Sequence, residues 1–186
     1  MVVKNDYKIY IVITQTGTIL SKILKLITGA KYNHVSLGIS GELDTLYSFG
    51  RKSAYNPFCA GFVIESPNYG TFKRFKNTKA LILELNVGER KPEIAKFILD
   101  FADNKKNYHY NYLGLFSAII KISLKRKKHF YCSEFVRFVL KKFKIKGIDA
   151  LPDIIQPIHF LSLPDVNVIY KGKLCDYSKK DTLKQI

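Results

Sequence analysis

The sequence predicts an α+β fold in which an antiparallel sheet is followed by amphipathic helices. Short segments rich in β-branched and aromatic residues follow one another in the first half of the chain. Later segments repeat apolar residues at the three- and four-residue spacing of a helix. A length of 186 residues is enough for one domain with a real core. We therefore expect a single domain over residues 1–186, with residues 175–186 as a flexible tail.

The predicted strands are separated by turns. Residues 33–39 alternate like a half-buried strand, which puts His34, Ser36 and Gly38 on one face. The turn Ser40-Gly41-Glu42 leads into a second strand at residues 43–49, so the two should form a hairpin. The other expected strands cover residues 7–14, 61–66 and 79–85, with closing strands at residues 159–163 and 166–170. Several strands in a row favour an antiparallel sheet.

Four helices are expected between and after these strands. Residues 18–28 form a basic amphipathic pattern, which is typical of a helix packed on a core or lying on a membrane surface. Pro92 suits the first turn of the next helix. Residues 112–124 predict a third helix, followed by an exposed basic run at residues 125–128. The fourth begins at Cys132 and ends near residue 146.

The Cys132 helix carries one apolar stripe, and the thiol lies on it in the first turn. The stripe consists of Phe135, Val136, Val139, Leu140 and Phe143. At a helix start, the dipole and the free N–H groups favour the thiolate, and the same N–H groups suit an oxyanion. Taken alone, however, a cysteine at this place is more often a small core residue.

Composition limits the classes of protein to which this chain can belong. Lys and Arg exceed Asp and Glu to give a net charge of +16, which attracts anionic lipid, cell-wall polymer or nucleic acid. Three scattered cysteines argue against a disulfide framework. The sequence shows no metal-ligand cluster or nucleotide fingerprint, so we expect no metal and no cofactor. Without a secretory signal or membrane-spanning stretch, we expect a cytoplasmic protein, peripheral at a membrane surface if it binds lipid.

Two motifs together resemble the circularly permuted papain-like cysteine hydrolases, which are related to NlpC-type peptidases and lecithin–retinol acyltransferases. The motifs are Asn-His-Val-Ser-Leu-Gly-Ile at residues 33–39 and Tyr-Cys-Ser-Glu-Phe-Val at residues 131–136. The permuted group places its histidine before its cysteine, as this chain does. Residues 32–34 (Tyr-Asn-His) and 110–115 (Tyr-Asn-Tyr-Leu-Gly-Leu) are similar to bacterial members. The resemblance implies a helix carrying the nucleophile packed against an antiparallel sheet carrying the base.

The resemblance also implies roles for single residues. Cys132 would be the nucleophile and His34 the base, with His159 as the alternative base. Related proteins orient the histidine with a polar residue on the following strand, which here is Ser48. Glu65, on the next strand, is a chemically stronger alternative. Tyr131 is a candidate for lining the oxyanion or substrate site.

The resulting expectation is a thiol hydrolase or acyltransferase that acts on an amide or ester through a thioester. Cell-wall peptides and lipid-like molecules are the substrate classes that the resemblance implies. An anionic membrane surface is a further candidate partner because the chain is so basic. The alternative is a non-catalytic basic module that binds anionic lipid or cell-wall polymer. Nucleic-acid binding is disfavoured, since the aromatic residues fall mostly in apolar stripes rather than beside the cations.

Overall fold

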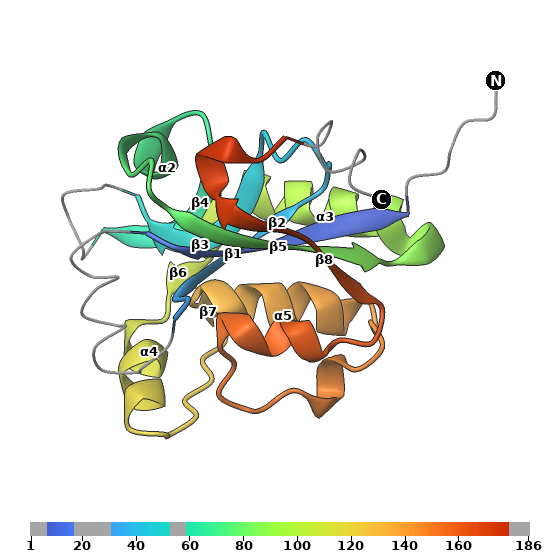
Figure 1. Ribbon diagram of the computed structural model, residues 1–186. Coiled ribbons are helices and arrows are strands. Elements are labelled where there is room, and N and C mark those ends of the chain that lie inside the picture. The colour runs from blue at the N-terminus through green and yellow to red at the C-terminus, as the bar shows by residue number, and fades with distance from the viewer. Residues whose placement is uncertain (1–6, 17–30, 53–58, 179–186) are drawn as a thin grey trace.

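The computed structural model describes residues 7–16, 31–52 and 59–178. Its centre is a six-stranded sheet with the order β4-β3-β2-β1-β5-β8, in which every neighbouring pair is antiparallel (Figure 1). The strands are β1 (Lys8–Gln15), β2 (His34–Gly38), β3 (Leu46–Arg51), β4 (Ala60–Glu65), β5 (Lys79–Asn86) and β8 (Val166–Lys173). The α+β class and the antiparallel sheet are therefore confirmed.

Alternation along the strands sorts their side chains onto two faces. The larger apolar cluster contains Ile9, Ile11 and Ile13 of β1 together with Val35 and Leu37 of β2. The opposite face carries a smaller cluster, in which Tyr10 and Val12 pack with Phe72. The two clusters follow from the pleat, because successive residues of a strand point to opposite faces. The central strands of the sheet are therefore covered on both faces, which gives the residues that they carry a rigid support.

Helices cover both faces of this sheet. The helices are α2 (Gly70–Arg74), α3 (Lys91–Asp103), α4 (Tyr112–Ile119) and α5 (Cys132–Lys142). Figure 1 shows α5 on one side of the sheet and α2 on the other. The buried stripe of α5 is the one the sequence predicts, with Phe135, Val136, Val139 and Leu140 all inside the larger cluster. Burying such side chains stabilises the fold by roughly 1.5–3 kcal/mol each.

A second, two-stranded sheet precedes α5. Here β6 (His109–Tyr110) pairs in parallel with β7 (His129–Phe130). The intervening residues form α4 and a loop. Asn111 caps α4 by accepting a hydrogen bond from Gly114 N at 3.0 Å. A side chain at Gly114 would overlap Asn111, so the cap requires glycine at this position. The short sheet thus fixes both ends of the α4 segment beside the start of α5.

Several expectations need correction. Residues 159–163 are not a strand, because Pro157 begins a 3₁₀ helix over Pro157–Ser162. The helix expected over residues 112–124 ends at Ile119. Residues 175–178, assigned to a tail, pack on the domain through the Tyr177 hydroxyl, which donates to Gly41 O at 2.9 Å. The sequence did not predict the short α-helix α2. It also did not predict four further 3₁₀ helices, at Gly88–Arg90, Lys105–Asn107, Ile148–Ala150 and Leu174–Asp176. The helix expected over residues 18–28 lies outside the described residues.

Candidate active site

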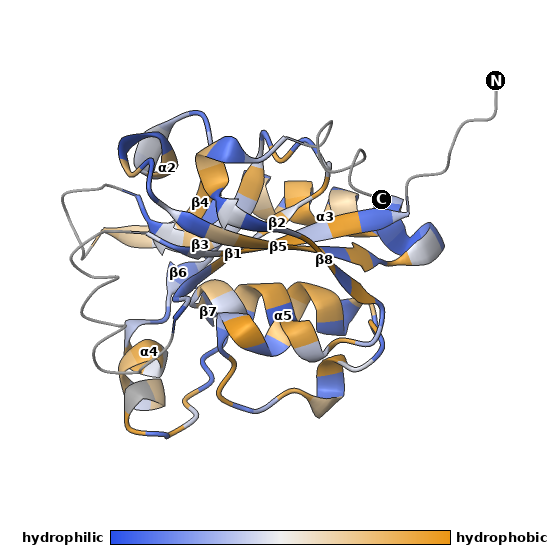
Figure 2. Cartoon of the chain, viewed as in Figure 1, coloured by the Kyte–Doolittle hydropathy of each residue, from blue (hydrophilic) through white to orange (hydrophobic). Residues whose placement is uncertain are grey.

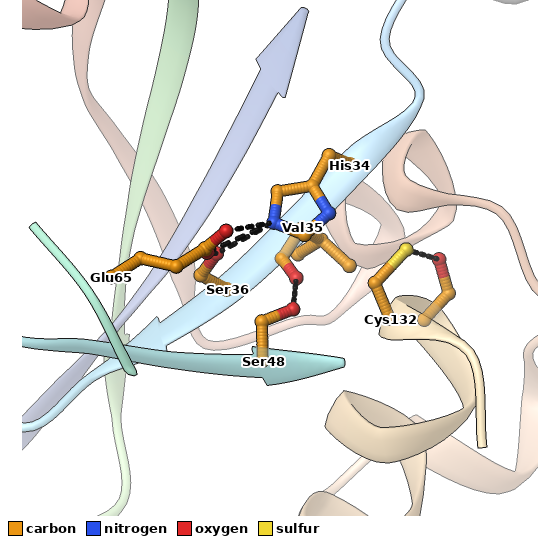
Figure 3. Close-up of polar contacts among 7 residues, drawn as sticks. His34, Val35, Ser36, Ser48, Glu65 and Cys132 are labelled. Atoms are coloured by element: carbon orange, nitrogen blue, oxygen red, sulfur yellow. Dashed lines mark hydrogen bonds and ion pairs between the residues drawn. The ribbon is translucent and has the colours of Figure 1, made fainter. Parts of the chain in front are cut away.

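His34, at the start of β2, is bound by a carboxylate from β4. Its Nε2 lies 3.1 Å from Glu65 Oε1 and 2.9 Å from Glu65 Oε2 (Figure 3). The two side chains are only 16% and 18% exposed, so water screens this ion pair weakly. The contact crosses β3, which lies between β2 and β4 in the sheet. His34 and Glu65 belong to the two strands that flank β3, so their side chains meet across it.

Ser36 strengthens the contact between His34 and Glu65. Its hydroxyl donates to Glu65 Oε2 at 2.7 Å and lies 3.3 Å from His34 Nε2. Sequence reasoning did not single out Ser36 as a site residue. The signal was present, however, since the alternation of residues 33–39 already placed Ser36 on the His34 face. Ser36 is fully buried, and its hydroxyl gives its one donor hydrogen to the carboxylate.

Cys132 opens α5 on the other side of the His34 ring. Figure 3 shows its sulfur facing the ring nitrogen that does not contact Glu65, which is Nδ1. The thiol is 8% exposed and lies 4.0 Å from Ser133 Oγ. The ring therefore lies between a carboxylate and a thiol at a helix N-terminus. Sequence reasoning could propose this meeting of β2 and α5 only from the family resemblance.

The charges around His34 favour its protonated form. Burial by itself would lower the pKa of His34, but the charge of Glu65 and hydrogen bonds to Cys132 and Glu65 raise it to about 10. Burial likewise opposes ionisation of Glu65, yet the charge and hydrogen bond of His34 and the Ser36 hydroxyl lower its pKa. At neutral pH the pair is therefore an imidazolium and a carboxylate. Each charge is largely shielded from water and lies next to its partner.

Ser48, the first choice for orienting the histidine, does not contact it. The Ser48 hydroxyl donates to Val35 O at 2.6 Å, which ties β3 to β2 where their ladder has ended. The alternative, Glu65, occupies the place beside His34. Both residues lie on the same sheet face, since Ser48 pairs with Val63, two positions before Glu65. Alternation alone therefore could not separate them.

Two other expected site residues have different surroundings. The Tyr131 hydroxyl donates to Ile155 O at 3.4 Å, so its side chain is engaged in the core. Its backbone N–H donates to Glu134 Oε2 at 3.1 Å and begins α5. His159, the alternative base, accepts a hydrogen bond from Gln156 N at 3.1 Å inside a 3₁₀ helix. That contact gives His159 a structural partner of its own.

Further residues shape the space around the thiol. A Cβ at Gly50 would lie 3.3 Å from His34 Cε1, so glycine leaves room for the ring. Tyr110 on β6 is partly buried, and burial followed by the nearby Cys132 and Tyr112 charges raises the pKa of its hydroxyl. The Tyr110 hydroxyl therefore stays protonated near the thiol. Neither Gly50 nor the position of Tyr110 could be assigned a role from residue spacing.

The sequence matches no protein-family model, and no curated protein shows significant sequence similarity to it. Within the described ranges, no three His, Cys, Asp or Glu side chains form a group able to hold a metal ion. In the same part of the chain, no helix is both long and apolar enough to cross a membrane. The arrangement of Cys132, His34 and Glu65 is thus the chemical feature from which a function can be argued.

Proposed function

We propose that the protein is a thiol-dependent hydrolase or acyltransferase that acts on an amide or ester through a thioester on Cys132. One observation carries the proposal: the His34 ring lies between the Glu65 carboxylate and the Cys132 thiol at the start of α5. A cysteine nucleophile needs a base that takes its proton, and that base needs an orienting partner. Cys132, His34 and Glu65 supply these three groups in order.

The proposed reaction has two steps. The Cys132 thiolate attacks the substrate carbonyl carbon, and the N–H groups of the first turn of α5 stabilise the oxyanion. The carbon–nitrogen or carbon–oxygen bond then breaks as His34 gives its proton to the leaving group. In the second step His34 removes a proton from water or another acceptor. That acceptor attacks the thioester and releases the acyl group and the Cys132 thiolate.

Glu65 and Ser36 act through His34. The carboxylate holds the ring by Nε2, which leaves Nδ1 for the thiol. Ser36 fixes the carboxylate oxygen that makes the shorter contact. If the chain has the fold of the permuted papain-like hydrolases, that fold would explain why Cys132, His34 and Glu65 meet. The same resemblance gives cell-wall peptides and lipid-like molecules as the proposed substrate classes.

A second candidate is a non-catalytic module that binds anionic lipid or cell-wall polymer. The observation that favours it is the net charge of +16, which a small-substrate enzyme does not need. In that case the His34–Glu65 pair would be a structural ion pair in the sheet. The two candidates differ in one measurable property, which is the reactivity of Cys132 toward an acyl donor.

Acylation of the protein by a p-nitrophenyl ester, quenched in acid and followed by intact-mass spectrometry, tests the proposal. We expect one acyl adduct on Cys132, lost in Cys132→Ala and slowed at least 100-fold in His34→Ala. His109→Ala, which changes an exposed histidine, is the matched control and should react like the wild type. Equal acylation of all three cysteines, or none of Cys132, would favour the binding module instead.

A further inference from the structure

Helix α4 has an apolar outer face. Leu113, Phe116 and Ile120 are 57%, 64% and 67% exposed. Their spacing of three and four residues puts them on one side of the helix. Ile122 and Leu124, in the loop after α4, are also exposed. Figure 2 shows this loop with hydrophobic (orange) and hydrophilic (blue) residues in alternation. Single exposed apolar residues are common, but five within one short segment indicate an interaction surface.

The same segment is rich in cations. Lys121, Lys125, Arg126, Lys127 and Lys128 are all exposed, and residues 112–128 contain no Asp or Glu. Lys125 pairs with Asp153 at 2.7 Å, an exposed contact of small energetic value. In the part of the chain that the structure describes, no salt bridge involves the other four. Apolar side chains thus stand beside cations that no neighbouring acid neutralises.

The surface is attached directly to the helix that carries Cys132. The Asn111 amide donates to Glu134 Oε2 at 3.1 Å and to Leu124 O at 3.2 Å. One buried side chain therefore links the start of α4, the loop after it and the first turn of α5. Figure 1 shows α4 at the end of the molecule where α5 begins. Anything held by residues 112–128 is therefore held close to the first turn of α5, which carries Cys132.

We propose that residues 112–128 dock the protein on an anionic lipid bilayer. The outer face of α4 inserts among the acyl chains, and Lys121, Arg126, Lys127 and Lys128 lie at the level of the lipid phosphates. Charge complementarity selects this occupant, because a second copy of the chain would bring the same cations face to face. The docking surface lies outside the Cys132–His34–Glu65 site, so lipid binding does not depend on the proposed chemistry.

Tryptophan fluorescence tests the insertion directly, because the chain contains no tryptophan. Phe116→Trp puts a reporter on the outer face of α4, and Val168→Trp puts a matched reporter on β8, where the valine is 53% exposed. Vesicles of phosphatidylcholine with 30% phosphatidylglycerol should shift the emission of Phe116→Trp to the blue. Brominated lipid should then quench it. The Val168→Trp emission should stay unchanged.

Vesicle co-sedimentation tests the charges. Arg126→Gln with Lys127→Gln should weaken binding to the anionic vesicles roughly 10- to 30-fold. Lys144→Gln with Lys146→Gln removes two exposed cations near the far end of α5 and should change binding less than threefold. Leu113→Ser with Phe116→Ser should also weaken binding about tenfold. Cys132→Ala should bind as the wild type does, which separates docking from the proposed reaction.

Three outcomes would overturn the docking proposal. The first is a wild-type protein that does not bind anionic vesicles, or binds pure phosphatidylcholine equally well. The second is an equal loss of binding in the control pair at residues 144 and 146, which would indicate diffuse charge attraction. The third is a dimer in sedimentation that Leu113→Ser with Phe116→Ser dissociates, with no vesicle binding, which would make α4 an interface between two copies.

Discussion

Helix α4 lies beside the start of α5, and the two helices expose different kinds of side chain to the solvent (Figure 1). The apolar stripe of α5 is buried, and its outer side carries cations such as Lys141 and Lys142. The outer side of α4 is apolar, with Leu113 and Phe116 exposed. A helix stabilised mainly by its own core contacts should look like α5. The apolar outer face of α4 therefore indicates a role that its packing does not explain.

The difference between the two helices corresponds to the two functions that we propose. The start of α5 presents a buried thiol to a charged histidine, which suits chemistry in a site with little water. The α4 segment presents apolar side chains and cations, which suits a surface. Changes at His34 and Glu65 should therefore alter reactivity and leave vesicle binding intact. Changes in residues 112–128 should do the reverse.

Glu65→Gln should have the largest effect on the α5 side of this comparison. The substitution keeps the size of the side chain but removes the charge that raises the pKa of His34. We expect acylation of Cys132 to slow about 10²- to 10⁴-fold, as when a charged orienting residue is neutralised in a triad. Vesicle binding should be unchanged. An acylation rate within threefold of the wild type would show that Glu65 is only a structural partner.

Stability should depend on pH through the same pair. The pKa of His34 is raised from 6.5 to about 10, so its contribution is full below pH 6.5 and is lost as the pH rises toward 10. The pKa of Glu65 is lowered from 4.5, so its contribution is present above pH 4.5 and is lost as the pH falls below it. Between pH 7 and 9 the free energy of unfolding should fall by up to roughly 2–3 kcal/mol.

Urea unfolding at a series of pH values measures this dependence. The double variant His34→Gln with Glu65→Gln removes both charges and should flatten the curve between pH 7 and 9. A wild-type stability that stays constant across this range would contradict the charged pair. The decline should be the same with and without vesicles, since the two groups lie outside residues 112–128.

Asn111→Ala should loosen the connection between the two helices. It removes the bonds to Glu134, Leu124 and Gly114, and leaves the buried Gly114 N–H without its acceptor. We expect a loss of about 2 kcal/mol in the free energy of unfolding. Vesicle binding should weaken along with it, since α4 loses its cap. Asn104→Ala, which removes an exposed bond to Asp100 O, is the control and should cost under about 1 kcal/mol.

Gly50→Ala should have the smallest effect. The added methyl group would lie 3.3 Å from His34 Cε1 and 3.4 Å from Val63 Cγ2, so the ring must shift by a few tenths of an ångström. We expect acylation to slow about tenfold, because small displacements of reacting groups reduce rates strongly. Gly61→Ala alters a neighbouring glycine of β4 that meets only the Lys52 side chain and should leave the rate unchanged. Equal rates in both variants would show that the ring tolerates the methyl group.

The parts of the fold that follow from local spacing could be predicted from the sequence. The strands at β1, β2, β4 and β5 and the buried stripe of α5 appear where alternation and helical periodicity place them. The strand expected at residues 159–163 was wrong because a short apolar run does not distinguish a strand from a 3₁₀ helix. Pro157 was the available signal, since proline suits the first turn of a helix.

The site was less predictable because it depends on contacts between residues that are far apart in the sequence, His34, Glu65 and Cys132. The strand pairing puts Ser48 and Glu65 on the same face, and the hydrogen bonds of each side chain decide which of them contacts the ring. The exposure of the outer face of α4 could not be predicted from the sequence either. A helix that is apolar all round gives no polar stripe, so the sequence cannot show which side is exposed.

Alkylation of Cys132 by iodoacetamide at pH 6 tests most directly whether the thiol and His34 form a reactive pair. We expect Cys132 to react much faster than exposed Cys59 and Cys175, and His34→Ala to remove most of this advantage. Cys175 is a suitable comparison, because a hydrogen bond to Asp176 raises the pKa of its thiol. Peptide mass spectrometry of the three sites gives the rates. Equal labelling of all three, or an unchanged Cys132 rate in His34→Ala, would contradict the pair.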